Sequence, residues 1–316
     1  MLANAPESCL ILIFIFKYYE VHFMDVRALN EFSGIIRKAV DDYGMINEGD
    51  KVAVGVSGGK DSMLLLLALK HLQSYYPKHF ELEAITIELG FEGMDFTPVR
   101  EMCAELDIPY TCLKTDIKEI VFDVRKEDNP CSLCAKMRRG ALNDAIRARG
   151  ISKLALGHHF DDAVETFLMS LLFEGRLSCF RPVTYMDRSG VTQIRPLIYA
   201  GEQKIINLAD SLNIPIVENP CPQDKASKRY EIKQLIKTLS ATYPDMKSKV
   251  FGAMQRLPLP GWGVSEANFQ RRIKSAPIHL LQVPGIEAAE ETVVFRCPRV
   301  HCKFCGIPVS KVPTKP

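Results

Sequence analysis

One short segment, residues 57–62, combines side chains and backbone that bind anions. It reads Ser-Gly-Gly-Lys-Asp-Ser between the apolar runs 52–56 and 63–69, so we expect a buried strand, a glycine turn and a helix. The adjacent glycines let backbone N–H groups approach a phosphate, and the helix N-terminus and Lys60 add positive charge. Asp61 is unfavourable beside a phosphate unless it orients a metal ion or a donor. The pattern differs from a Walker loop, because its glycines are adjacent and no Gly-Lys-Ser/Thr follows.

A second group of reactive side chains consists of three cysteines. Cys131 and Cys134 lie at the expected start of a helix, which can turn both thiols toward one metal and favours their thiolate forms. Cys221 stands between two prolines and offers a third thiolate. The trio fits an iron–sulfur cluster with one open iron, or a zinc site with a fourth ligand. A persulfide-and-disulfide pair and buried structural cysteines are the alternatives.

A third group lies in residues 157–166, which read Gly-His-His-Phe-Asp-Asp-Ala-Val-Glu-Thr. Asp161 or Asp162 can cap the helix that follows, but two aspartates and Glu165 exceed what capping needs. Asp162 and Glu165 share a helix face, and carboxylates that face a pyrophosphate usually act through Mg²⁺. One carboxylate can also accept a proton from the attacking nucleophile. We favour a functional role for Asp162 over capping, and for His158 we expect only proximity to phosphate.

The elements that position these groups alternate between strand and helix patterns, which predicts βαβ units around a parallel sheet. Ligands in such sheets bind at the carboxyl ends of the strands. Strands are expected at 51–56, 82–88, 110–115, 153–157 and 214–217, with a short hairpin at 181–195. Helices are expected at 29–43, 62–73, 97–106, 133–149, 163–173 and 202–212, and further basic helices at 227–239 and 247–257.

Five motifs in order carry a specific resemblance. They read Ser-Gly-Gly-Lys-Asp-Ser, Cys-Ser-Leu-Cys-x-x-x-Arg-Arg-Gly, Leu-Gly-His-His-x-Asp-Asp, Glu-Gly-Arg-Leu and Ile-Arg-Pro-Leu-Ile-Tyr. The first resembles the PP-loop of enzymes that split ATP into AMP and pyrophosphate to adenylate a substrate. Together the motifs resemble the tRNA 2-thiocytidine synthetase family over residues 32–257, most of the chain.

The resemblance implies a HUP-type α/β fold with helices on both sheet faces, ATP and Mg²⁺ at the PP-loop, and a tRNA substrate. It also implies a 4Fe–4S cluster held by Cys131, Cys134 and Cys221, which carries the sulfur that replaces the adenylated C2 oxygen of an anticodon-loop cytidine. The candidate ATP-binding residues are Ser57, Gly58, Gly59, Lys60, Asp61, Ser62, Gly157 and His158. The candidate catalytic residues are Asp61, Asp162 and Arg138, and Asp162 is also the candidate Mg²⁺ ligand.

Several arginines and lysines are candidates for contact with substrate. Arg138 lies one helical turn after Cys134, where it can face both the cysteines and the α-phosphate, and relatives place a catalytic cation there. Contact with RNA phosphates is the alternative for Arg138. Basic residues on both sides of the expected cleft predict tRNA binding that weakens with salt, and the candidates are Arg139, Lys225, Lys228 and Arg229.

One departure from the family concerns the segment after Cys221. Many members carry a second cysteine pair here, whereas this chain reads Cys-Pro-Gln-Asp, with Asp224 at the position of the second cysteine. The related 2-thiouridine synthetases also have a lone cysteine at this point, so cytidine or uridine as the target, and the sulfur source, stay open. Near the C-terminus, a partial zinc site and a tail of oxidisable thiols are equal alternatives for Cys297, Cys302 and Cys305.

Composition sets the remaining expectations. The chain has 316 residues, a net charge of +2 and 10 cysteines, which predicts a cytoplasmic protein in a reducing compartment with only local basic patches. We expect residues 1–23 to be a non-native extension, 24–48 an N-terminal helix and 49–218 the catalytic domain. Residues 219–260 should form a helical unit with the third cysteine, and 261–316 an irregular tail. The apolar run 9–16 is too short to span a membrane.

Three functions compete at this point. The first is an ATP-dependent tRNA sulfurtransferase, supplied with sulfur by a cysteine desulfurase or free sulfide, with a homodimer as the assembly to consider. The second is another PP-loop enzyme, such as an amidotransferase-type ligase or a lysidine-type synthetase, which does not require the cysteine trio. The third is a non-catalytic, zinc-stabilised RNA-binding protein, which leaves Asp61 and the aspartate pair at 161–162 without a role.

Overall fold

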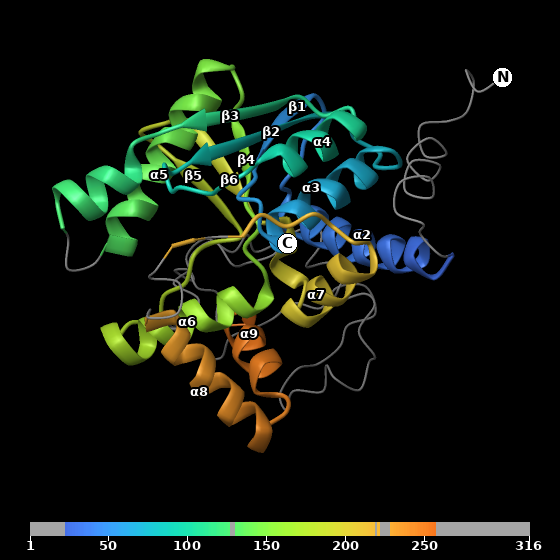
Figure 1. Ribbon diagram of the computed structural model, residues 1–316. Coiled ribbons are helices and arrows are strands. Elements are labelled where there is room, and N and C mark those ends of the chain that lie inside the picture. Colours follow the sequence, from blue (N-terminus) through green and yellow to red (C-terminus); the bar gives the residue numbers. More distant parts are fainter. Residues whose placement is uncertain (1–22, 127–129, 219, 222–227, 257–316) are drawn as a thin grey trace, which may run out of the picture. The chain divides into compact units, whose positions relative to one another are not determined.

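The computed structural model describes residues 23–126, 130–218, 220–221 and 228–256, which all fall within one compact unit, residues 1–265. Its described part contains a six-stranded sheet in the order β3-β2-β1-β4-β6-β5 (Figure 1). Every neighbouring pair is parallel except β5 with β6. The strands are β1 (Asp50–Gly55), β2 (Phe80–Glu88), β3 (Tyr110–Lys114), β4 (Lys153–Ala155), β5 (Val183–Met186) and β6 (Val191–Ile194).

Helices cover both faces of this sheet, as expected for a HUP-type α/β fold. Along β1, Val52 and Val54 join the larger core, whereas Ala53 joins a second core on the opposite face with Leu142 and Ile146. The helices are α2 (Phe23–Tyr43), α3 (Lys60–Gln73), α4 (Thr97–Glu105), α5 (Pro130–Ala148), α6 (Phe160–Glu174), α7 (Glu202–Ser211), α8 (Lys228–Thr242) and α9 (Met246–Arg256), with the π-helical turn η1 (Glu119–Val124) and the 3-10 turn η2 (Pro196–Tyr199).

The edge of the sheet beyond β4 differs from the expectation. We expected a strand at 214–217, but these residues form no strand; this prediction is wrong. The predicted hairpin takes the place beside β4 instead, because Leu154 of β4 pairs in parallel with Gln193 of β6. The segment 214–217 instead crosses the loop after β1, where Val217 N–H donates to the Gly58 carbonyl at 2.9 Å. It therefore closes the functional end of the sheet rather than extending its edge.

The helices α8 and α9 pack on α6 (Figure 1). Ile232 and Phe251 are buried in the larger core, and the rings of Phe251 and Phe160 lie 4.7 Å apart. No helix among the described residues is long and apolar enough to cross a membrane. The predicted extension (apart from Phe23), the tail 261–316, Lys225, Asp224 and the three C-terminal cysteines lie outside the described residues.

Candidate active site

The loop between β1 and α3 is closed by the hydroxyl of Ser62. Ser62 Oγ accepts the Ser57 N–H at 3.0 Å, lies 3.0 Å from Ser57 Oγ and reaches the Gly59 carbonyl at 3.0 Å. Gly59 is the residue before α3, and its own N–H donates to Ser57 Oγ at 3.4 Å. Among the described residues, no side chain of the N-cap residue caps the first N–H groups of the helix. The start of α3 therefore keeps backbone donors and partial positive charge for an anion.

Two glycines of the site are required by close approach of the backbone. Gly58 has φ +82°, and a Cβ there would lie 2.6 Å from Val217 Cβ. A Cβ on Gly157 would lie 3.2 Å from the Ser62 nitrogen. Gly58 thus lets the segment of Val217 rest on the nucleotide loop, and Gly157 lets the end of β4 approach the start of α3.

Lys60 and Asp61 form the charged part of the loop. Lys60 Nζ lies 3.2 Å from Asp61 Oδ2 and 3.7 Å from Glu202 Oε1 of α7. Asp61 Oδ1 is buried and has no hydrogen-bond partner among the described residues; His159 Nε2 lies 3.8 Å away. A carboxylate oxygen without a donor suits a cation that accompanies a phosphate.

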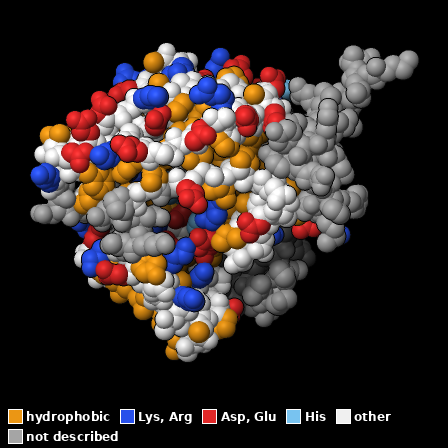
Figure 2. Space-filling model, viewed as in Figure 1, with side chains coloured by type: hydrophobic (Ala, Val, Ile, Leu, Met, Phe, Trp, Pro, Cys, Tyr) orange, Lys and Arg blue, Asp and Glu red, His pale blue; other side chains and the backbone are white. Residues whose placement is uncertain are grey.

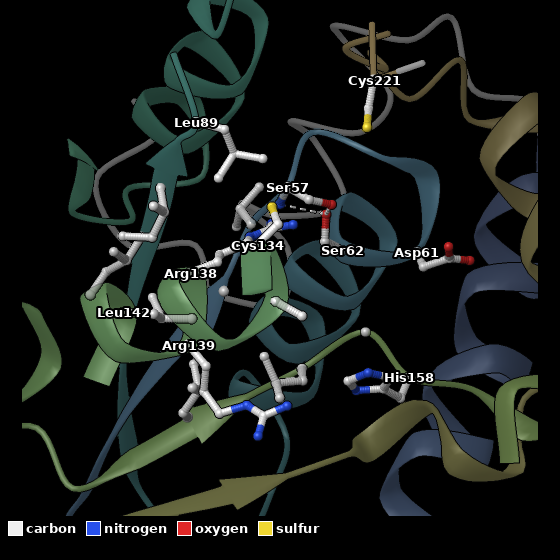
Figure 3. Close-up of a pocket in the computed structure, with 18 of the residues that line it drawn as sticks. Ser57, Asp61, Ser62, Leu89, Cys134, Arg138, Arg139, Leu142, His158 and Cys221 are labelled. Carbon is white, nitrogen blue, oxygen red and sulfur yellow. Dashed lines mark hydrogen bonds between the residues drawn. The ribbon is translucent and has the colours of Figure 1, made fainter. Parts of the chain in front are cut away.

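One cavity of about 470 Å³ joins the nucleotide loop to the three cysteines. Figure 3 shows Cys134 beside Ser57, and Cys221 on a separate segment across the cavity. Burial raises the pKa of the Cys134 thiol; the charge of Arg138 opposes the rise, and Cys221 and Cys131 add to it. The lining includes Ser57, Asp61, Ser62, Cys131, Cys134, Arg138, Arg139, Gly157, His158, Gln193 and Cys221.

The cysteines do not form a ready site for a single ion. No set of three His, Cys, Asp or Glu side chains within the described ranges is close enough to hold one metal ion. Cys131 is exposed, and Cys134 and Cys221 are partly buried. Three thiols around one cavity suit a larger group better, since a cluster of several irons spans more space than one ion.

A second cavity of about 480 Å³ lies on the other side of the nucleotide loop. Ser57, Asp61 and Arg138 line both cavities. Burial lowers the pKa of Arg138, and neighbouring Cys134 raises it. Lys60 and Gly59 also line the second cavity, and its apolar walls are Ile87, Leu89, Met94, Phe96, Ile216 and Val217. Arg138 therefore borders both the second cavity and the thiol-lined one.

His158 lies in the first cavity as a neutral side chain. Burial, followed by the nearby charge of Arg195, lowers its pKa to about 4. Its ring lies 5.1 Å from that of Phe180, and its Nδ1 has no hydrogen-bond partner in the described structure. His158 can therefore contribute polarity near phosphate without a full charge.

Asp162 is committed to local contacts and does not line either cavity. Its Oδ2 accepts the His159 N–H at 3.0 Å, while the Asp162 N–H donates to His159 Nδ1 at 3.4 Å, which forms a capping box at the start of α6. Its Oδ1 lies 3.3 Å from Arg229 Nη1 of α8. Capping, the alternative that we favoured less, thus accounts for one oxygen of Asp162, and a catalytic or metal-binding role for it stays a prediction.

Two candidate tRNA-binding residues on α8 already have partners within the chain. Arg229 contacts Glu165 Oε2 at 3.1 Å as well as Asp162. Burial and the charge of Asp162 raise the pKa of Glu165, and Arg229 opposes the rise. Lys228 pairs with Glu231 at 3.2 Å in an exposed position. Arg229 therefore has a structural task, the docking of α8 on α6, whatever else it binds.

Most of these side chains were predicted from the sequence as members of one site, but some were not. The structure places Ser57, Asp61, Cys134 and Arg138 around one cavity, as expected. It adds Glu202, Val217, Phe96 and Gln193, which the sequence analysis did not single out. The only available signal was the position of Glu202, shortly after the Ile-Arg-Pro-Leu-Ile-Tyr motif. Val217, Phe96 and Gln193 belong to none of the motifs that the sequence shows.

Comparison with known proteins agrees with this geometry. Residues 29–239 match the family described as the PP-loop domain. The tRNA-cytidine(32) 2-sulfurtransferase of Pelobacter propionicus is 39% identical over 70% of this chain and 84% of its own length, and that of Geobacter sulfurreducens is 35% identical over 74% and 92%.

A solved structure shares the fold. It is the U34-tRNA thiolase NcsA from Methanococcus maripaludis with its [4Fe-4S] cluster, with a TM-score of 0.60 and 24% identity over 80% of this chain and 81% of that chain. At this identity the likeness supports the fold alone. The sequence relatives carry the assignment, and the chain belongs to the PP-loop family and, within it, to the family of the tRNA-cytidine(32) 2-sulfurtransferases.

Proposed function

We propose that this chain uses ATP to replace the C2 oxygen of cytidine 32 in tRNA with sulfur. The observation that carries the proposal is the cavity that the nucleotide loop, with Ser57 and Ser62, shares with Cys131, Cys134 and Cys221. Adenylation modifies the C2 oxygen, and sulfur then attacks the carbon that bears this oxygen, so the two steps need a common chamber. The other PP-loop ligases and a zinc-stabilised RNA-binding protein do not require this juxtaposition.

ATP fits across the two cavities. The phosphates would lie at the start of α3, where Lys60, Ser57 and the uncapped N–H groups offer donors. The apolar walls of the second cavity, such as Met94 and Phe96, suit a purine ring. Mg²⁺ would be held by Asp61, whose Oδ1 has no hydrogen-bond partner in the described part of the chain, rather than by Asp162.

The donor set at the other end of the chamber fits a 4Fe–4S cluster. Cys131, Cys134 and Cys221 supply three thiolates and leave one iron open. When bound, the cluster supplies the sulfur for the activated carbon. Burial raises the pKa of the Cys134 thiol, and the charge of Arg138 opposes part of this rise and so favours the thiolate.

The residues of the chain perform the adenylation half of the reaction. The C2 oxygen of the pyrimidine attacks the α-phosphate of ATP, and pyrophosphate leaves. Lys60 and the loop N–H groups stabilise charge on the pyrophosphate, and Arg138 lies where it can stabilise the α-phosphate. The oxygen then departs as part of AMP, a far better leaving group than the carbonyl oxygen itself. Apolar walls such as Leu142 and Leu156 keep water from the adenylate.

Contact with tRNA depends on local charge. Figure 2 shows Lys and Arg side chains interspersed with Asp and Glu over the visible face rather than gathered into one basic field. Arg139, at the cavity wall, is the candidate contact nearest to the reacting base. The target base must leave its stack to enter the chamber. The sulfur comes from a cysteine desulfurase or from free sulfide. The reaction takes place in the cytoplasm. A homodimer is the assembly to be tested.

The decisive experiment is mass spectrometry of tRNA nucleosides from a strain that lacks the gene. The expected result is loss of 2-thiocytidine and its return when the wild-type gene is restored. Loss of 2-thiouridine with 2-thiocytidine intact would contradict the proposed target and reassign the enzyme to uridine. Retention of both thionucleosides would reject a role in thiolation altogether.

A further inference from the structure

One carboxylate oxygen is shared between the nucleotide loop and the C-terminal helices. Glu202 is the first residue of α7, and its backbone N–H donates to Asp161 Oδ2 at 2.7 Å. Its Oε1 lies 2.7 Å from Lys233 Nζ of α8 and 3.7 Å from Lys60 Nζ of the loop. The Glu202 side chain is only 20% exposed, so these charges are screened less than on an open surface. Two lysines distant in sequence therefore compete for one acceptor.

This contact differs from the other ion pairs that dock the C-terminal helices. Arg229 reaches Asp162 and Glu165 on α6, and Lys247 reaches Asp161 at 2.6 Å. None of those three acids pairs with Lys60. Among the described residues, Glu202 is the acid through which α8 and the nucleotide loop share a charge.

We propose that Glu202 is a positioning residue that holds Lys60 for the nucleotide and, through Lys233, links nucleotide binding to the docking of α8. The inference rests on the proposed binding of ATP phosphates at this loop. Phosphate attracts Lys60 more strongly than a shared carboxylate does, so bound ATP takes up part of the Lys60 charge while Glu202 still orients the side chain. Glu202 is then shared less and holds Lys233 more firmly. By linkage, ATP and docked α8 stabilise each other.

The proposed link between nucleotide binding and α8 also affects Cys221, the third cysteine. Only residues 222–227 separate Cys221 from α8, and upstream of Cys221 the Val217 N–H is bonded to Gly58. The chain before Cys221 is thus bonded directly to the nucleotide loop at Gly58, and the helix that follows Cys221 in the sequence contacts that loop through Lys233 and Glu202. Occupancy of the nucleotide site would steady the thiolate that faces Cys134 across the chamber.

Hydrogen exchange of the α8 amides tests the link, with and without ATP, in the full chain and two variants. In the wild type, ATP should slow exchange across Lys228–Thr242 about threefold or more. Lys233→Met should abolish this effect of ATP while ATP still binds. Lys237→Met is the matched control, since Lys237 is exposed on the same helix and has no ion pair among the described side chains; there ATP should slow exchange as in the wild type.

Glu202→Gln tests the positioning of Lys60 with nearly unchanged shape. ATP should bind at least as tightly, because a negative charge near the phosphates is removed. Turnover of ATP in the presence of tRNA should fall about tenfold, because Asp61 is then the one carboxylate left to orient Lys60 among the described residues. The effect of ATP on α8 should vanish. A variant that was merely less stable would instead lose ATP affinity and turnover together.

The inference is overturned if Glu202→Gln turns over ATP at the wild-type rate. It is also overturned if ATP does not slow the hydrogen exchange of the α8 amides in the wild type. If Glu202→Gln does not fold, Lys233→Met decides: an ATP effect on α8 that persists in Lys233→Met rejects the link. ATP binding and exchange do not involve thiolation. A wild-type enzyme that fails to thiolate cytidine would therefore reject the proposed function and leave this test valid.

Discussion

The two ends of the chamber are built differently. The nucleotide end comes from consecutive residues, in which Ser62 holds Ser57 and Gly59 and the following helix is buried along Ser62–Leu69. The cysteine end comes from α5 and a distant segment, and its thiols range from exposed Cys131 to partly buried Cys221. The first end is held by its own hydrogen bonds, whereas the second depends on how two segments meet.

This difference predicts that a substitution at one end of the chamber leaves the structure of the other end intact. Removing a thiol leaves the bonds of the nucleotide loop in place, and removing Asp61 touches none of the three cysteines. Arg138 is the charged side chain outside the loop that lines both cavities, together with the apolar Ile87 and Leu89. Variants at either end therefore report which half of the reaction has been lost.

The largest expected effect comes from the cysteines. Cys131→Ala or Cys221→Ala should abolish thiolation, because each removes a thiolate from a set of three, while ATP binds with a wild-type dissociation constant within about threefold. The measurement is the 2-thiocytidine content of tRNA after reaction in vitro, with nucleotide binding followed by calorimetry. Cys112→Ala, which changes a partly buried cysteine away from the cavity, is the control and should thiolate normally.

The reciprocal change is Asp61→Ala. It should remove ATP-dependent activity while anaerobically purified protein keeps its iron, sulfide and brown colour. Normal thiolation by either cysteine variant would contradict the assignment of the trio. Full activity of Asp61→Ala would place the nucleotide elsewhere, and loss of iron from it would show that the two ends are not independent.

A smaller effect is expected from Gly58→Ala, which disrupts the contact between the nucleotide loop and the segment of Val217 that leads to Cys221. Gly58 has φ +82° and a new Cβ would lie 2.6 Å from Val217 Cβ, so the free energy of unfolding should fall by about 1–3 kcal/mol. Because Val217 must shift, the segment of Cys221 should lose order as well. Urea unfolding gives the first quantity, and iron content reports the second.

Gly59→Ala is the matched control for stability in the same loop. A Cβ at Gly59 would meet Ser57 Oγ at an ordinary 3.5 Å, and its backbone is extended with φ −76°. The free energy of unfolding should therefore fall by less in Gly59→Ala than in Gly58→Ala. Equal losses in the two variants would show that the contact with Val217 is not what constrains Gly58.

The same contrast explains what the sequence could reveal. The loop at 57–62 was predictable because its chemistry lies in adjacent residues, and the alternation of elements around it predicted the parallel sheet. Cys131 and Cys134 were readable from their spacing on one helix. Cys221 entered through its flanking prolines and the family resemblance, since no local pattern shows which distant segment meets α5.

The errors arose where tertiary contacts decide the outcome. Residues 214–217 have the composition of a strand, but the hairpin takes the place beside β4, and Val217 bonds to Gly58 instead. The role of Asp162 stays a prediction, but the sequence did not show that Arg229 would reach this side chain from α8. Glu202 went unnoticed because its importance lies in two lysines, Lys60 and Lys233, that only folding brings together.

The smallest expected effect concerns pH at the nucleotide end. Burial and the charge of Arg195 lower the pKa of His158 to about 4, whereas in the unfolded chain it lies near 6.5. Between these values the unfolded chain binds the proton and the folded chain does not, so the free energy of unfolding falls as pH drops from 6.5 toward 4 and levels off below. His158→Gln lacks this titration, although it loses the contact with the Phe180 ring at every pH.

Urea unfolding at pH 7 and at pH 4.5 measures the effect for the wild type and for His158→Gln. The wild type should lose more stability than the variant over this interval, and the difference isolates His158 because the other titrating groups are common to both proteins. A parallel decline would show that the imidazole charges freely in the folded chain. The cavity beside the nucleotide loop would then be wetter than its apolar walls indicate, and the protection of an adenylate from water would have to come from the bound tRNA.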